Sequence, residues 1–184
     1  MIEGILGRVP VGDGQSVRLM GIINLSRESF YKGSVAGPHE ALSLAEAMAE
    51  QGADMIDLGA VSTAPGSPNI SEAVERERLF PALKDILDNL DITVSIDTQR
   101  SAIAGDALSC GAACINDVSG LSDPGMAASV AEYDGSLIIM ASRKRPGDLL
   151  YLNEIIALLG ERVRIAEQAG VCPAKISVDP GIGK

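Results

Sequence analysis

The sequence contains few of the residues that usually support metal, redox or nucleophilic chemistry. It has no tryptophan, only 3% aromatic residues and a single histidine, His39. Its three cysteines, Cys110, Cys114 and Cys172, are an odd number and match no zinc-binding spacing with that histidine. We therefore expect three buried free thiols, as in a cytoplasmic protein, and no Ser-His or Cys-His nucleophile.

The sequence also lacks long apolar runs and an excess of positive charge. No stretch reaches the roughly 18 apolar residues of a membrane-spanning helix, and the N-terminal MIEGILGRVP does not resemble a signal peptide. The net charge of −10 argues against a nucleic-acid-binding surface, although a local pocket can still bind an anion. With 46% hydrophobic residues among 184, the chain is predicted to form one globular domain.

Short apolar runs alternate with helix-compatible segments along the chain. Residues 2–17 contain two β-like runs around Gly12-Asp13-Gly14, which predicts an N-terminal β-hairpin. Strands are then predicted over 18–25, 55–59, 93–97, 114–120, 136–140 and 175–178, and helices over 38–51, 71–90, 101–112, 126–133 and 149–168. This strict alternation is typical of a parallel sheet.

Two of the predicted helices carry clear positional signals. Ser71 can accept a hydrogen bond from the first turn of the helix that follows it, as an N-cap residue does. The last helix carries Leu152, Ile155, Leu159 and Val163 at helical spacing, which predicts one apolar face.

Two architectures fit a parallel sheet of this kind, a (β/α)8 TIM barrel and a doubly wound sheet. The strand starts repeat roughly every 31 residues, so eight repeats need about 250 residues, the usual size of a TIM barrel. No GxGxxG motif follows the first strand. We therefore expect a single α/β barrel domain over residues 1–184, with about six βα units after a hairpin at 1–17. Because an open barrel leaves two unpaired edges, we expect the chain to continue past Lys184 or another segment to close the barrel.

Polar side chains stand at the carboxyl ends of the predicted strands: Asn24, Asp97, Asn116, Asp117 and Asp179. The carboxyl ends of parallel strands meet on one face, where sites are built. A buried carboxylate there is costly unless a cation, an N–H donor or a ligand satisfies it. Each residue alone could instead cap a helix or fix a loop, but the set predicts a shared site. Asp57, inside its strand, is equally compatible with a structural role.

Several segments resemble one family in order and at its spacing. MGIINLSRESFYKGS, at residues 20–34, resembles the first signature of dihydropteroate synthases, and GADMIDLGAVSTAPGS, SIDTQR, GAACINDVSG and ISVDPGIGK resemble its later segments. The resemblance covers nearly all of residues 20–184 and implies a pterin-binding barrel. It implies a transferase that condenses 6-hydroxymethyl-7,8-dihydropterin pyrophosphate with 4-aminobenzoate or a related arylamine and releases pyrophosphate, in folate or folate-like biosynthesis. It also implies a homo-oligomer, such as a homodimer.

The resemblance assigns a pterin-binding set: Asp97, Asn116, Asp179 and Met140. The chemistry fits, because carboxylates accept hydrogen bonds from the adjacent N–H groups of the 2-amino-4-oxo ring edge. An asparagine amide can donate to one ring atom and accept from another.

The resemblance also assigns a catalytic set: Asn24, Ser26, Phe30 and Thr63. Asn24 stands where the family holds Mg²⁺ and the pyrophosphate group. An amide oxygen suits Mg²⁺, which takes few protein ligands together with phosphate oxygens.

The chain departs from the family pattern at three positions of the arylamine half of the site. Val61 replaces a Glu, Ala64 replaces an Arg, and Ala141 stands where many members carry a His. The basic loop 143–145 could supply positive charge instead, or could be simply solvated. Two alternatives stay open: a pterin-dependent methyltransferase acting on a corrinoid protein, and a non-catalytic pterin-binding homologue. The loop after Asn24 favours the synthase.

Overall fold

The computed structural model describes residues 3–26, 40–61, 70–143, 147–149 and 151–182. Six parallel strands form one sheet in the order in which they occur in the sequence. They are β3 (Met20–Asn24), β4 (Met55–Gly59), β5 (Thr93–Asp97), β6 (Cys114–Asp117), β7 (Ser136–Met140) and β8 (Ile176–Asp179). A doubly wound sheet reverses its strand order at a switch point, whereas a barrel keeps it sequential. The order is therefore that of a barrel, as predicted.

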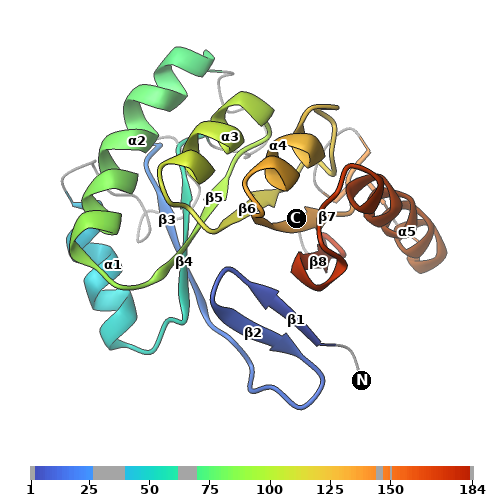
Figure 1. The fold of residues 1–184 in the computed structure, drawn as a ribbon, viewed down its shortest axis with the longest axis horizontal. Helices are drawn as coiled ribbons and strands as arrows, with labels where there is room; N and C mark the ends of the chain where they lie inside the picture. Colours follow the sequence, from blue (N-terminus) through green and yellow to red (C-terminus); the bar gives the residue numbers. More distant parts are fainter. Residues whose placement is uncertain (1–2, 27–39, 62–69, 144–146, 150, 183–184) are drawn as a thin grey trace.

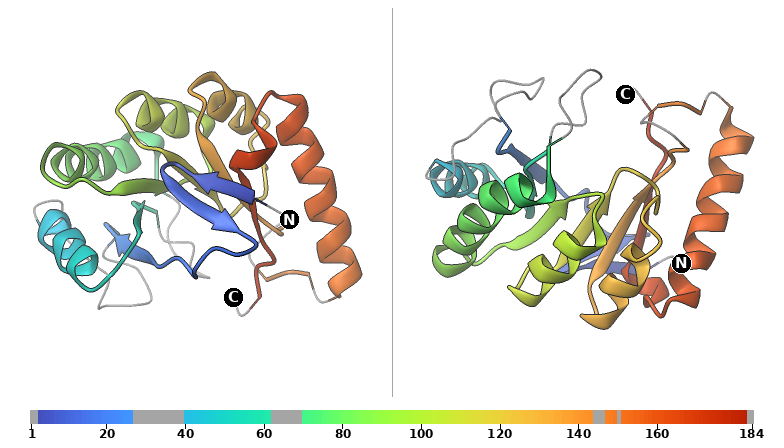
Figure 2. Two further views of the ribbon diagram at one scale, coloured as in Figure 1. Left: turned by 60° about the horizontal axis from the view of Figure 1, so that its bottom comes forward. Right: turned by 90° about the horizontal axis from the view of Figure 1, so that it is seen from above.

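In the described part of the chain, five α-helices lie outside the curved sheet (Figures 1 and 2). They are α1 (Ala41–Glu50), α2 (Glu72–Asn89), α3 (Ser101–Ser109), α4 (Met126–Glu132) and α5 (Leu152–Gln168), and a 3₁₀ turn, η2 (Pro173–Lys175), precedes β8. The predicted strands and helices are thus present, with ends shifted by a few residues. Ser71 caps α2 as predicted, because its Oγ accepts a hydrogen bond from the Val74 N–H at 3.4 Å.

The N-terminal hairpin is present, but its turn is not where the sequence suggested. Strands β1 (Glu3–Leu6) and β2 (Val9–Gly12) pair antiparallel around Gly7 and Arg8, whereas Gly12-Asp13-Gly14 follows the second strand. Gly7 has φ +60°, and a Cβ there would lie 2.7 Å from Ala113 Cβ and 2.7 Å from Thr93 Cγ2. Glycine is required at this position because the turn packs directly against the starts of β5 and β6.

This hairpin covers the amino-terminal end of the sheet. Ser136 Oγ, at the start of β7, accepts a hydrogen bond from the Gly7 N–H at 2.9 Å and donates one to the Ile5 carbonyl at 3.1 Å. Leu6 and Val9 pack with Met55 and Cys114. The hairpin thus fills this end, and the carboxyl ends of the strands remain as the place for a site.

Alternate residues of each strand face the helices and form the main core. Ile23, Leu58, Ile96, Ile115 and Ile139 are fully buried there. The other set faces away from the helices, on what we call the inner face of the sheet. The polar strand-end residues other than Asp117 lie on this inner face, whereas Asp117 is level with Ile139 on the side that faces the helices. The alternation thus separates the core from the site.

Helix α5 does not bury the predicted face as a whole. Ile155, Leu158 and Ala166 are buried, whereas Leu152 is 67% exposed. Within the described part of the chain, β3 and β8 are the edges of the sheet, and Val178 of β8 is 47% exposed. The apolar residues of α5 therefore extend beyond the part of the helix that packs on β7, and Leu152 is among the exposed ones.

The prediction of three buried thiols was right for one cysteine. Cys114 is fully buried on the inner face of β6, but Cys110 and Cys172 are exposed. Both exposed cysteines flank helices, Cys110 at the end of α3 and Cys172 just before η2. Among the described residues, no helix is long and apolar enough to cross a membrane.

Candidate functional site

The sheet register brings three predicted site residues to one level. Asn24 is aligned with Gly59, Gly59 with Asp97, and Asp97 with Asn116. A Cβ on Gly59 would lie 3.3 Å from Asp97 Cβ, so the glycine leaves room for the carboxylate. These side chains form a polar row near the carboxyl ends of β3 to β6, on the inner face.

Met140 and Asp179 lie beside each other at the ends of β7 and β8. Asp179 Oδ1 accepts a hydrogen bond from the Gly181 N–H at 2.8 Å. Met140 is fully buried, and a Cβ on Gly181 would lie 3.3 Å from its Cγ, so the turn after β8 packs over it. Asn116 is aligned with Ile138 and Ile138 with Ser177, so Asp179 adds a second carboxylate two residues beyond the level of the polar row.

Asn116 is oriented by a buried carboxylate that lies deeper in the barrel. Its Nδ2 donates a hydrogen bond to Asp57 Oδ2 at 2.9 Å, and Asp57 is 3% exposed. Asp57 is level with Ser95, two residues before Asp97 on β5. The side-chain amide of Asn116, a residue predicted to bind the pterin, is thus held by a carboxylate deeper in the barrel.

Asp117, the neighbour of Asn116, does not join the site. Its carboxylate accepts hydrogen bonds from the Ser119 N–H and Oγ at 2.8 and 2.6 Å, and from the Leu121 N–H at 2.7 Å. Burial raises the pKa of Asp117, and these hydrogen bonds act in the opposite direction. The residue closes the turn after β6, where Leu121 adopts φ +61°.

Asn24 and Ser26 offer oxygen ligands at the end of β3. Ser26 is 1% exposed, and its Oγ has no hydrogen-bond partner among the described residues. Those residues also contain no cluster of three or more His, Cys, Asp or Glu that could hold a metal alone. Mg²⁺ accepts one or two protein oxygens and completes its shell with phosphate oxygens and water. An amide oxygen and a buried hydroxyl therefore fit a Mg²⁺–pyrophosphate group.

Two further predicted residues, Phe30 and Thr63, lie outside the described residues, as does most of the basic loop. Its first member, Arg143, is exposed, and its Nη1 lies 3.4 Å from Glu154 Oε1 on α5. Arg143 therefore has an acidic partner within the protein.

A buried ion pair behind the site was not anticipated from the sequence. Glu75 of α2 is 1% exposed and pairs with the guanidinium of Arg100, and it accepts a hydrogen bond from Thr98 Oγ1 at 2.6 Å. Arg100 Nη2 also donates to the Ile70 carbonyl at 2.7 Å. The pair fixes the segment that follows Asp97. One signal was available, because Glu75 occupies the same helical stripe as the buried Leu79.

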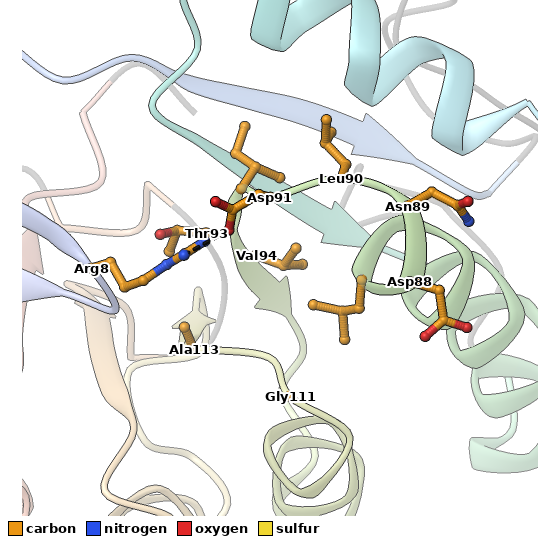
Figure 3. A pocket seen from close by; sticks show the side chains of 11 residues that line it. Arg8, Asp88, Asn89, Leu90, Asp91, Thr93, Val94, Gly111 and Ala113 are labelled. Carbon is orange, nitrogen blue, oxygen red and sulfur yellow. Dashed lines mark ion pairs between the residues drawn. The ribbon is translucent and has the colours of Figure 1, made fainter.

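A surface depression of about 520 Å³ lies at the opposite end of the sheet (Figure 3). It is lined by the end of α2, the start of β5 and Arg8 of the hairpin turn, and Arg8 pairs with Asp91 at 2.7 Å. Both side chains of that pair are exposed. This depression lies away from the carboxyl ends of the strands and does not belong to the site.

Comparison with known proteins agrees with the fold. Residues 20–184 match the family model described as pterin binding enzyme. A probable bifunctional folylpolyglutamate synthase/dihydropteroate synthase of Halobacterium salinarum is 42% identical over 179 residues, which cover 93% of this chain and 22% of that protein. The dihydropteroate synthase of Bacillus subtilis is 36% identical over 90% of this chain and 59% of its own length.

A solved structure gives the same result. The crystal structure of Burkholderia cenocepacia dihydropteroate synthase, complexed with 7,8-dihydropteroate, superposes with a TM-score of 0.83 at 31% sequence identity. The match covers 98% of this chain and 64% of that one. The chain thus spans less than two thirds of these relatives, and its six parallel strands with the five helices between them form part of a TIM barrel, as predicted. The chain belongs to the family of pterin-binding enzymes.

Proposed function

We propose that the protein containing this chain is a dihydropteroate synthase-type transferase. It would join 6-hydroxymethyl-7,8-dihydropterin pyrophosphate to 4-aminobenzoate or a related arylamine and release pyrophosphate. One observation carries the proposal, namely the polar row of Asn24, Asp97 and Asn116, aligned by the register on the inner face. A relative that carries this fold was crystallised with 7,8-dihydropteroate.

The polar row suits a pterin ring. The Asp97 carboxylate would accept hydrogen bonds from adjacent N–H groups of the ring, and Asp179 would accept from another part of its edge. Asn116, held by Asp57, would accept and donate at once. Apolar contact would come from Met140, although its burial means that the turn at Gly181 must adjust for direct contact.

The reaction would be a displacement at the methylene carbon. The arylamine nitrogen forms a bond to that carbon, the bond from carbon to the pyrophosphate oxygen breaks, and the nitrogen loses a proton. When bound, Mg²⁺ would neutralise charge on the pyrophosphate. Asn24 and Ser26 would hold that group, and Asp97 and Asn116 would orient the ring so that the methylene faces the amine.

The test is pyrophosphate release by the full-length protein, with and without the arylamine and Mg²⁺. We expect release that depends on both, and we expect Asn24→Ala to lose turnover while pterin binding survives. A panel of 4-substituted anilines belongs in the assay, because Ala64 replaces a family arginine of the arylamine pocket and 4-aminobenzoate itself should be used poorly.

The pyrophosphate assay, together with a separate assay for methyl transfer, separates the alternatives. Pterin binding without release for any amine would reject the synthase and favour a non-catalytic homologue. Methyl transfer from a reduced methylpterin to a corrinoid protein would instead identify a methyltransferase on the same barrel.

A further inference from the structure

Asp57 is a buried carboxylate that the proposed reaction does not use directly. It lies in the middle of β4 on the inner face, aligned with Ile22 and Ser95. The polar row of Asn24, Asp97 and Asn116 lies two residues closer to the strand ends. A ring bound to that row would therefore not touch Asp57 directly, because the residues of the row lie between them.

The hydrogen bond from Asn116 to Asp57 crosses an intervening strand. Asp57 is on β4 and Asn116 on β6, and β5 lies between them in the sheet. The residue of β5 at the level of Asp57 is Ser95, which is fully buried and small enough to let the two side chains meet. The donor and acceptor are 59 residues apart in the sequence.

The surroundings of Asp57 favour its role as a hydrogen-bond acceptor. Ser95 and Cys114 are aligned in the same layer, and burial raises the pKa of the Cys114 thiol to about 12, with the negative charge of Asp57 acting in the same direction and Ser95 opposing it. The thiol thus stays protonated and adds no negative charge beside the carboxylate.

A carboxylate oxygen can only accept, so its partner atom on Asn116 must be the amide nitrogen. This settles which end of the amide turns toward Asp57, leaving Oδ1 and the second N–H of Nδ2 for a ligand. If the amide were reversed, both its donor and its acceptor would meet the wrong ring atoms. Two hydrogen bonds would be lost together, and buried groups would remain unpaired.

We propose that Asp57 is a positioning residue that sets the orientation of the Asn116 amide and thereby the affinity and specificity for the pterin ring. This inference rests on the proposed function, because it takes Asn116 as a ring ligand. Asp57 touches no reacting atom and acts through Asn116.

The test compares Asp57→Asn with wild type in the full-length protein. The new amide can present either oxygen or nitrogen to Asn116, so the orientation is no longer imposed while size is kept. With 6-hydroxymethyl-7,8-dihydropterin as the probe, calorimetry should give a Kd about tenfold higher, as expected for one or two lost hydrogen bonds. In turnover, KM for the pterin pyrophosphate should rise by about the same factor and kcat should change less than about threefold.

Ser95→Ala is the matched control, since it alters the same layer without removing the carboxylate. It should leave Kd within about twofold of wild type. If Asp57 had only a structural role, Asp57→Asn would lower the melting temperature and the active fraction of the protein. The apparent kcat would then fall without a rise in KM.

Three outcomes bear on the inference, and each decides it. Loss of pterin binding in Asn116→Ala together with unchanged binding in Asp57→Asn overturns the inference and leaves the proposed function standing. A wild type that binds no pterin rejects the proposed function and this inference with it. If Asp57→Asn fails to fold, NMR of the wild-type Asn116 side chain decides: one slowly exchanging Nδ2 proton supports the inference, and rapid exchange of both overturns it.

Discussion

Breaking the ion pair between Glu75 and Arg100 should destabilise the fold strongly. Glu75 is 1% exposed, while the side chain of Arg100 is 30% exposed. Replacing Arg100 with Met removes the positive charge and keeps most of the aliphatic packing. Among the described residues, Glu75 then keeps the hydrogen bond from Thr98, and the Ile70 carbonyl loses the hydrogen bond from Arg100.

The magnitude follows from leaving a buried carboxylate without its counter-charge. Removing one partner of a buried pair typically costs about 3–5 kcal/mol, and the partial exposure of Arg100 favours the lower end of that range. Glu75→Gln should cost less, about 1–2 kcal/mol, because a neutral amide can still accept from Thr98. The double variant Glu75→Gln/Arg100→Met should be more stable than Arg100→Met alone, because no charge remains buried.

The assay is equilibrium unfolding in urea of wild type, both single variants and the double variant, analysed as a double-mutant cycle. Arg76→Met is a suitable control, because the Arg76 pairs with Glu72 and Asp106 lie at the surface and should contribute less than about 1 kcal/mol. The reasoning is refuted if Arg100→Met costs no more than this control, or if the double variant is as unstable as Arg100→Met.

Three further predictions follow from other parts of the structure. Asp97→Ala should abolish pterin binding in calorimetry, whereas Cys114→Ser should not; equal affinity in wild type and Asp97→Ala would remove the ring from this site. Gly7→Ala should lower the free energy of unfolding by about 1–3 kcal/mol, because φ is +60° and two side chains lie 2.7 Å from the new Cβ; an unchanged urea midpoint would contradict the close packing of the hairpin turn. The backbone N–H of Ser101, at the start of α3, lowers the pKa of Asp123. This stabilisation is complete above the unfolded pKa of about 3.9 and disappears as the pH falls through the lower folded value, so Asp123→Asn should flatten the acid limb of a plot of stability against pH.

The sequence by itself determined the order and type of the elements. Short β-branched runs such as 93–97 and 136–140 alternate with helix-compatible segments, and that local pattern is sufficient to predict parallel strands with helices between them. The alignment of Asn24, Asp97 and Asn116 was also predictable. Each ends a strand, and parallel strands place their carboxyl ends together.

Only the tertiary structure decided which residues meet across elements. The hairpin turns at Gly7, where the starts of β5 and β6 leave no space for a Cβ, and the local Gly12-Asp13-Gly14 signal could not reveal this contact. Cys110 is exposed at the C-terminal end of α3, which its position next to a predicted helix could not reveal.

The two polar pairs that support the site depend on the same kind of information. Asn116 and Asp57 are 59 residues apart in the sequence, and Arg100 and Glu75 are 25 apart. A local pattern shows that a carboxylate occupies a buried position, but its partner depends on register, strand order and the space left by small residues such as Ser95. The sequence therefore determined where the polar row would form, and the packing of the barrel determined how its side chains are held.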